Sequence, residues 1–157
     1  MEIANRSNLA NSFCSGIIQT DNHRLYGTPT YYAQQLYATR AGVRPLKVES
    51  NLPPDVGLDL SATLTRAGDA VILFAVNDSP QDVTRTVDFS AFGAAGQDVE
   101  VRTLTDSKHA GEPDVTNSFA EPRRVTPETS TFKTAGPKFD YRFPALALTM
   151  FEWRVAK

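Results

Sequence analysis

The stretch from Leu58 to Val76 constrains the fold most, because it carries the patterns of two adjacent β-strands. Its first half alternates apolar and polar residues, which is typical of a strand with one buried face and one solvent-exposed face. Its second half, Ala70 to Val76, is apolar throughout, as in a strand buried on both faces. Between the two, Gly68 provides the positive φ angle that a tight reversal needs. We therefore predict a β-hairpin at the centre of a sheet.

The later segments also have the lengths and turn signals of strands. They lie at residues 83–89, 99–104, 139–143 and 145–155. In the last of them the apolar face changes sides, which predicts a β-bulge near Met150. Segment 118–137 contains prolines at 122, 127 and 137 and is predicted to be a surface connection with at most a short strand near Phe132. Short strands without a helical period after Gly42 favour a mainly β fold, an antiparallel β-sandwich of jelly-roll-like type.

The strongest helix signal lies before this β-rich region. Thr28 is suited to cap the N-terminus through its hydroxyl, and Pro29 follows at the first helical position, where its missing N–H is not needed. Apolar and aromatic residues then recur at helical spacing on one side, namely Tyr32, Ala33, Leu36 and Tyr37. Gly42 is predicted to end the helix as a left-handed C-cap. The segment Phe13–Thr20 is predicted to be a buried strand, so this region has the order strand, loop, helix.

Composition argues against several classes of function. The chain has 157 residues, a formal net charge of −2 and no basic run, which argues against nucleic-acid binding. No apolar stretch approaches the roughly 20 residues of a membrane-spanning helix. A single cysteine excludes an internal disulfide bond. The first residues lack the basic and then apolar layout of a secretion signal, so the compartment stays undetermined, with a cytoplasmic location favoured.

The sequence contains no constellation of catalytic or metal-ligating residues. Its carboxylates are scattered over turns and strand edges, and His23 and His109 lie in different predicted loops without partners at metal-ligand spacing. No serine has the strand, Gly-x-Ser-x-Gly and helix context of a nucleophile. Cys14 is expected to be a small buried apolar residue of a strand rather than a nucleophile. We therefore expect no catalytic residue, no metal site and no cofactor in this chain.

Two segments resemble a known enzyme family. Residues 4–20, ANRSNLANSFCSGIIQT, and residues 28–37, TPTYYAQQLY, are similar to the end of the catalytic barrel in α-L-arabinofuranosidases of glycoside hydrolase family 51. The remaining residues resemble the C-terminal β-sandwich of that family, with an inner strand ending at Asn77 and a motif around Asn117. The resemblance implies that residues 1–42 are the last β/α unit of a (β/α)8 barrel and that residues 43–157 are the β-sandwich domain.

The resemblance also implies a function within a larger protein. The family is similar to other retaining glycosidases, which use one glutamate as acid/base and a second as nucleophile, roughly 5 Å apart. In the family both precede the region that this chain matches, and none of its own glutamates fits either motif. The chain is accordingly expected to be the C-terminal accessory domain of an enzyme that hydrolyses terminal non-reducing α-L-arabinofuranosyl residues in arabinosides. Its expected partners are the catalytic barrel, arabinose-containing oligosaccharides in the intact enzyme and, in a homo-oligomer, further copies.

Residues at the expected barrel mouth are the candidates for contact with the sugar, namely Asn11, Cys14, Ser15, Gln19 and Asn22. The family places an amide side chain from its last barrel strand near the sugar, and alignment puts Cys14 or Ser15 there. Either this contact is missing in the chain, or Asn11 or Gln19 replaces it. The loop from Gln19 to Arg24 is expected to lie near the barrel mouth.

Two alternative functions remain open from the sequence. One is a carbohydrate-binding β-sandwich module, a class that usually presents exposed aromatic side chains on one sheet face. In this chain Tyr141 and Trp153 lie in predicted strands, where packing in the core is the expected role. The other is a structural domain that closes the barrel or builds an oligomer interface. The apolar helix stripe is expected to pack on the sandwich or on another chain, because soluble monomers rarely expose large apolar patches.

Overall fold

The central sheet of the protein consists of β3 (Arg44–Leu46), β4 (Leu58–Leu64), β5 (Ala70–Asn77), β10 (Ala147–Arg154), β7 (Asp98–Asp106) and β8 (Val125–Lys133), in that spatial order. All neighbours in this sheet are antiparallel. A computed structural model describes residues 9–11, 16–50, 57–93, 96, 98–106, 108 and 112–155. The mainly β fold predicted from the sequence is confirmed.

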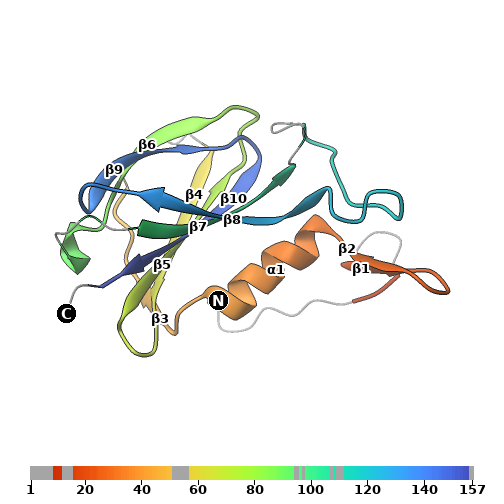
Figure 1. The fold of residues 1–157 in the computed structure, drawn as a ribbon, viewed down its shortest axis with the longest axis horizontal. Coiled ribbons are helices and arrows are strands. Elements are labelled where there is room, and N and C mark those ends of the chain that lie inside the picture. The colour runs from red at the N-terminus through yellow and green to blue at the C-terminus, as the bar shows by residue number, and fades with distance from the viewer. Residues whose placement is uncertain are drawn as a thin grey trace.

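Among the described residues, a second pair of strands, one helix and a small hairpin flank this sheet. Strand β6 (Val83–Asp88) pairs with β9 (Lys138–Phe143), and β1 (Ile18–Thr20) pairs with β2 (Leu25–Gly27). Helix α1 spans Pro29–Arg40, and a 3-10 turn spans Ser90–Phe92. Figure 1 shows β6 and β9 on one face of the central sheet and α1 on the opposite face. No helix among the described residues is long and apolar enough to cross a membrane.

The predicted hairpin forms β4 and β5, with an unbroken register from Leu58 opposite Asn77 to Leu64 opposite Val71. Gly68 has a φ of 73° in the turn, as the reversal requires. Strand β5 is buried along almost its whole length because the sheet is covered on both faces. The hairpin is therefore the centre of the fold, as its two sequence patterns indicated.

Two apolar cores lie on the two faces of the sheet. The core under β6 and β9 contains Trp153, Phe151, Phe143 and Phe89, and the core under α1 contains Leu36, Ile72, Phe74 and Met150. Strand β10 contributes alternate residues to both. The β-bulge predicted near Met150 is wrong, because β10 keeps one continuous register with β5 from Ala147 to Arg154. The apolar face only seemed to change sides because both faces of this central strand are buried.

The prediction of a surface connection over residues 118–137 is wrong for its central part. Residues 125–133 form strand β8, which pairs with β7 over nine residue positions. This strand lies at the sheet edge, where Pro127 opposite Leu104 is tolerated because one side of an edge strand needs no backbone donors. Its polar residues are mostly exposed, so the sequence lacks the apolar alternation by which strands are detected.

The helix starts as predicted but ends differently. The Thr28 hydroxyl accepts a hydrogen bond from the Tyr31 backbone N–H, and Pro29 is the first helical residue. The left-handed C-cap predicted for Gly42 is wrong, because the capping residue is Ala41, with a φ of −58°, and Gly42 does not have a positive φ. Glycine is needed at 42 for space, since a Cβ atom there would lie 2.3 Å from the Leu64 carbonyl oxygen.

The region before the helix also differs from the prediction. Within Phe13–Thr20, residues 13–15 lie outside the described residues, and only Ile18–Thr20 forms a strand. This strand is partly exposed rather than buried, because its partner is β2 in a small hairpin and not a larger sheet. The expected loop before the helix therefore contains β2 and a short turn, residues 21–24.

Candidate functional site

The turn of the β1–β2 hairpin is held together by Asp21. One oxygen of its carboxylate accepts hydrogen bonds from the backbone N–H groups of His23, at 3.0 Å, and Arg24, at 2.8 Å. Its other oxygen accepts two from the Arg24 guanidinium, at 2.8 and 2.6 Å. The hydrogen bond from His23 and those from Arg24 hold the pKa of Asp21 below its ordinary value. The turn is thus ordered by its own side chains, while Asn22 and His23 are exposed at its tip.

A loop of the sandwich holds the hairpin from the side. The buried Asn117 amide donates to the Gly27 carbonyl at the end of β2, at 2.8 Å, and to the Val125 carbonyl at the start of β8, at 2.9 Å. Its side-chain oxygen accepts from the Val125 N–H at 2.7 Å. Two residues further on, the Phe119 ring packs edge-on against Tyr26, with centroids 4.9 Å apart. The hairpin is therefore fixed to the sandwich by a polar and an aromatic contact.

The junction between hairpin and helix is equally constrained. The Thr28 N–H donates to the Ile17 carbonyl at 2.8 Å. Position 27 has no space for a side chain, because a Cβ atom on Gly27 would lie 2.5 Å from the Tyr31 ring. Helix α1 in turn packs on the sheet through buried Leu36 and through Tyr37, whose ring stacks on Phe74 at 4.0 Å between centroids. Hairpin, helix and sandwich form one connected unit.

The candidate sugar-contacting residues fall around this hairpin. The Asn11 side-chain amide makes two hydrogen bonds with Thr20. Its oxygen accepts from the Thr20 backbone N–H and its nitrogen donates to the Thr20 hydroxyl, both at 2.7 Å. The Gln19 amide donates to the Gly16 carbonyl at 3.1 Å. Asn22 is at the exposed turn, and Cys14 and Ser15 lie outside the described residues. Asn11 and Gln19 are thus engaged within the chain, while the role in sugar contact stays a prediction.

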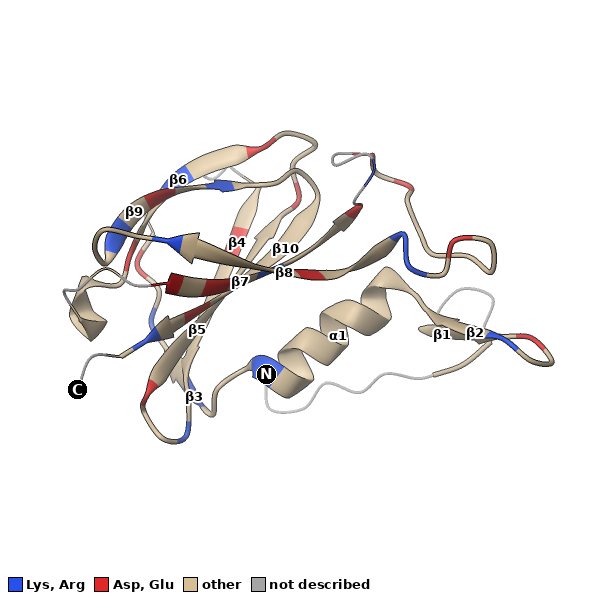
Figure 2. Cartoon of the chain, viewed as in Figure 1, with Lys and Arg blue, Asp and Glu red and all other residues tan. Residues whose placement is uncertain are grey.

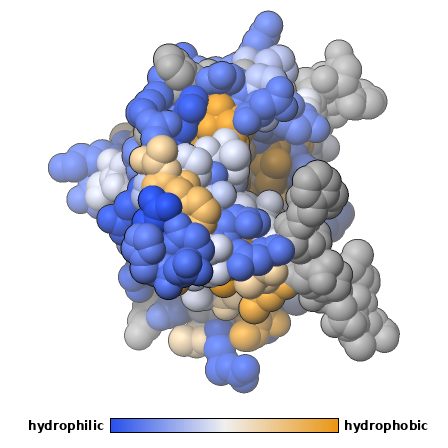
Figure 3. Space-filling view, turned by 90° about the vertical axis from the view of Figure 1, so that its right-hand side faces the viewer, coloured by the Kyte–Doolittle hydropathy of each residue, from blue (hydrophilic) through white to orange (hydrophobic). Residues whose placement is uncertain are grey.

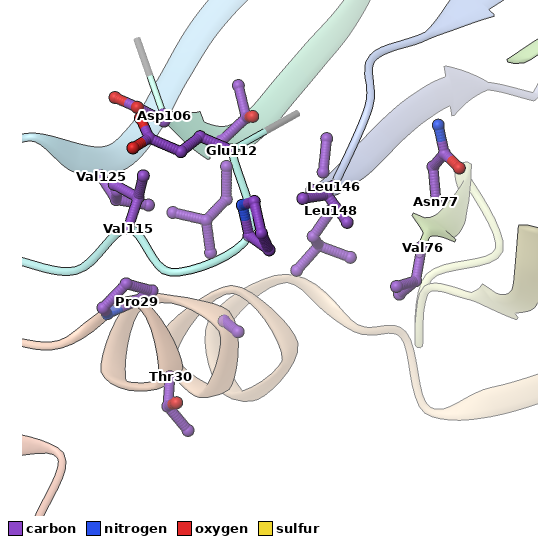
Figure 4. Close-up of a pocket in the computed structure, with 15 residues that line it drawn as sticks. Pro29, Thr30, Val76, Asn77, Asp106, Glu112, Val115, Val125, Leu146 and Leu148 are labelled. Carbon is purple, nitrogen blue, oxygen red and sulfur yellow. The ribbon is translucent and has the colours of Figure 1, made fainter. Parts of the chain in front are cut away.

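A cavity of about 410 Å³ lies between the first turn of α1 and the ends of β5, β7 and β10 (Figure 4). Its lining is mainly apolar and includes Pro29, Ala33, Val76, Leu104, Val115 and Leu148. Two carboxylates, those of Asp106 and Glu112, also border it. Sequence patterns did not indicate this cavity, because its walls come from segments that are far apart along the chain.

Both carboxylates at the cavity are bound to Arg124. Its guanidinium donates to the two oxygens of buried Asp106, at 3.0 and 3.3 Å, and to Glu112 at 3.2 Å. The hydrogen bonds with Asp106 raise the pKa of Arg124 above its ordinary value. Arg124 also lies 3.8 Å from Glu121, which accepts a hydrogen bond from Lys108 that lowers the Glu121 pKa. This cluster fixes the loop around Glu112 at the border of the cavity. Asp106 and Glu112 are joined through one guanidinium and do not face each other across a space that could hold a sugar.

Among the residues that the structure describes, no group of three or more His, Cys, Asp or Glu side chains could hold a metal ion.

A sequence model described as the α-L-arabinofuranosidase C-terminal domain matches residues 1–147. The chain belongs to this family. A comparison with the curated proteins finds no match. Among solved structures, this chain is similar to part of an arabinose-bound GH51 α-L-arabinofuranosidase, MgGH51, with a TM-score of 0.77 and 21% identity, covering 92% of this chain and 22% of that one.

Two further solved structures have the same fold. The α-L-arabinofuranosidase from Thermotoga maritima, in its arabinose complex, gives a TM-score of 0.76 at 20% identity and covers 89% of this chain and 32% of that one. The family 51 enzyme AbfB from Bifidobacterium longum gives a TM-score of 0.65 at 22% identity, covering 94% and 30% respectively. The domain therefore spans about a fifth to a third of the length of these three similar proteins.

Several residues that hold the hairpin and the cavity loop in place were not predicted as site residues from the sequence. Asn117 and Gly27 are 90 positions apart, and Arg124 is 18 positions from Asp106. No periodicity links such pairs. The only sequence signal was the motif around Asn117, which marked the segment without indicating its contact.

Proposed function

We propose that the chain serves as the C-terminal accessory domain of an α-L-arabinofuranosidase and does not cleave glycosidic bonds by itself. The observation that carries this proposal is the family match over residues 1–147, combined with the 22% to 32% of the similar enzymes' length that the chain spans. In this proposal residues 1–42 belong to the catalytic barrel as its last β/α unit, and residues 43–157 form the β-sandwich that supports it.

The carboxylates of the described residues support a non-catalytic role. A retaining glycosidase needs two carboxyl groups about 5 Å apart on either side of the scissile bond. At the cavity, Asp106 and Glu112 instead share the guanidinium of Arg124. Their ion pairs with Arg124 fix the loop that follows β7. In this proposal the carboxyl groups that cleave the glycosidic bond belong to the catalytic domain.

The exposed face of helix α1 also favours a role as a supporting domain, because its composition is typical of a surface that a neighbouring domain covers. The helix carries no charged residue before Arg40, as Figure 2 shows by its uniform tan colour up to that end. Its exposed side presents Thr30, Gln34, Gln35 and Ala38. Solvent-facing helix surfaces usually carry charged residues, whereas an uncharged face suits packing against another surface, because charged residues are depleted in interface cores.

The aromatic side chains do not favour a carbohydrate-binding module. Trp153 is fully buried and stacks on Phe89 at 5.0 Å between centroids, and Tyr141 packs on Phe151 at 4.7 Å. Among the Phe, Tyr and Trp side chains of the described residues, Tyr37 is the most exposed, at 39%, and its ring is stacked on Phe74. A stacking platform for sugar rings is therefore missing from the described sheet faces.

The proposal is tested by assaying the purified 157-residue chain and the complete enzyme that contains it on 4-nitrophenyl α-L-arabinofuranoside. We expect hydrolysis by the complete enzyme and none by the chain alone. Turnover by the isolated chain that persists through two orthogonal purification steps would refute the proposal. Calorimetric titration of the chain with arabinan oligosaccharides is expected to give no heat of binding, and saturable heat would favour the binding-module alternative.

A further inference from the structure

The sandwich loop at residues 117–119 makes two different contacts with hairpin β1–β2, and these contacts suggest a role beyond packing. We propose that Asn117 and Phe119 are positioning residues that hold this hairpin at the edge of the active site of the complete enzyme. This inference rests on the proposed function, since it concerns a site formed together with the catalytic domain. It assigns to the accessory domain a specific influence on substrate binding.

Asn117 supplies the polar half of this connection. It is 1% exposed, and both the nitrogen and the oxygen of its side-chain amide bind backbone groups, in two different elements. One partner, Val125, begins β8 in the sandwich, and the other, Gly27, ends β2 in the hairpin. Because buried amides lose their solvation when a partner moves away, this geometry ties the end of the hairpin to the edge of the sheet.

Phe119 supplies the aromatic half and reaches the turn itself. Its ring meets Tyr26 edge-on, at an interplanar angle of 86°, and the Arg24 guanidinium lies 4.8 Å from its centroid. Arg24 at the same time holds the Asp21 carboxylate that orders the turn. A continuous series of contacts therefore runs from the sandwich through Phe119 and Arg24 to Asp21, and it sets the orientation of the exposed tip.

The position of the hairpin in the chain indicates what this orientation controls. The hairpin lies directly before helix α1, in the region proposed as the last β/α unit of the barrel. In such barrels the segments between a strand and the following helix lie on the face that carries the active site. The exposed Asn22 and His23 at its tip are the groups that would border bound arabinoside. Leu25 is 70% exposed on the same hairpin, and Figure 3 shows several separate apolar areas on this end of the molecule.

The decisive experiment measures kcat and KM of the complete enzyme on 4-nitrophenyl α-L-arabinofuranoside. In Phe119→Ala we expect KM to rise about fivefold with kcat changed less than about twofold. The ring contact stabilises the ordered hairpin by roughly that factor, and the ordered hairpin contributes equally to ground-state and transition-state binding. Phe119→Tyr keeps the ring and is expected to retain the original KM. The matched control is Phe92→Ala, which removes a half-buried ring from the opposite core.

Hydrogen exchange of the 157-residue chain provides the second measurement. In Phe119→Ala and in Asn117→Ala, the peptide covering residues 18–27 is expected to exchange about fivefold faster, while β5 keeps its protection. An equal acceleration in β5 would mean a merely structural role and would overturn the inference. An unchanged KM in the Phe119→Ala enzyme would also overturn the inference, and so would an equal rise of KM in the Phe92→Ala enzyme. A complete wild-type enzyme without arabinofuranosidase activity would instead refute the proposed function itself, and the inference with it.

Discussion

Glu100 of β7 and Glu152 of β10 lie directly opposite each other in the antiparallel register, so two carboxylates of like charge are cross-strand neighbours. Arg40, in the last turn of α1, reaches both, at 3.9 Å from each carboxylate. Arg102 and Arg154 each pair with one of them, at 2.8 and 2.9 Å. Like charges in this position repel one another, so Arg40 has a double role: it compensates the repulsion and fixes the end of the helix to the sheet.

Arg40→Gln is expected to lower the free energy of unfolding by about 0.5–1 kcal/mol, since partly exposed ion pairs are weakened by solvent. The loss should shrink in 1 M salt, where screening reduces the repulsion between Glu100 and Glu152. Urea unfolding at low and high salt measures both effects. The control is Arg66→Gln in the exposed β4–β5 turn. Equal losses in the two variants would show that Arg40 has no special role.

The parts of the fold that the sequence predicted are those set by local physics. The β4–β5 hairpin depends on alternation and on one glycine with a positive φ, and the start of α1 depends on Thr28 and Pro29, all of which act within a few residues. Strand β8 was missed because its strand character comes from pairing with β7, while its own side chains are polar. The bulge near Met150 was wrongly predicted because the two-sided burial of β10 depends on layers contributed by distant segments.

The candidate site was predictable to a smaller extent. The resemblance placed Asn22 in a segment next to the helix, where the structure has an exposed turn. It did not indicate that Asn11 binds Thr20, or that Asn117 and Phe119 hold the hairpin. Such contacts join residues that are close only after the chain has folded, and their partners are backbone carbonyls and ring edges, which leave no pattern in a sequence.

Gly42 and Gly136 form a matched pair for a test of close packing. A Cβ atom at Gly42 would lie 2.3 Å from the Leu64 carbonyl oxygen, whereas a Cβ atom at Gly136 meets nothing within 4 Å. Gly42→Ala is therefore expected to lower the free energy of unfolding by about 1–3 kcal/mol, and Gly136→Ala to change it by less than about 0.5 kcal/mol. Urea unfolding of both variants checks this, and comparable stabilities would contradict the tight approach of α1 to β4.

The Asp21 carboxylate makes the hairpin turn sensitive to acid. Its pKa lies below the ordinary 3.8, first because of the hydrogen bond from the His23 N–H and then because of Arg24. A lowered folded-state pKa means that the stabilising contribution is complete above the unfolded-state pKa and is lost as pH falls through the folded-state pKa. We expect residues 18–27 to lose exchange protection below about pH 4, and this response to vanish in Asp21→Asn.

Carbon-13 NMR of the Asp21 carboxyl group measures the same property directly. The titration midpoint should lie below 3.8. Asp21→Asn retains an oxygen acceptor for the backbone N–H groups of His23 and Arg24. A difference in exchange protection between the variant and the original chain therefore reports the effect of the carboxylate charge alone. A midpoint at or above 3.8 would show that the turn is not ordered around a charged carboxylate.

Asn77 provides a second test of a buried amide, at the end of the sheet opposite to the β4–β5 turn. It is 1% exposed, donates to the Gln81 and Pro144 carbonyls at 2.9 and 2.8 Å, and accepts from the Ser79 N–H at 3.0 Å. Asn77→Ala leaves these backbone groups without a partner and is expected to lower the free energy of unfolding by about 2 kcal/mol. Thermal unfolding should then shift by about 6 °C, because a domain of this size loses roughly 3 °C per kcal/mol.

The control for Asn77 is Asn22→Ala, which removes the same amide from the exposed hairpin tip and is expected to change the free energy of unfolding by less than about 0.5 kcal/mol. The two variants differ in burial and not in the chemistry of the deleted group. A large difference between them would therefore assign the stability to the buried hydrogen bonds that join β5 to the segment before β10. Similar small losses would mean that water replaces the amide at Asn77, and the connection between these two segments would then have to depend on apolar packing alone.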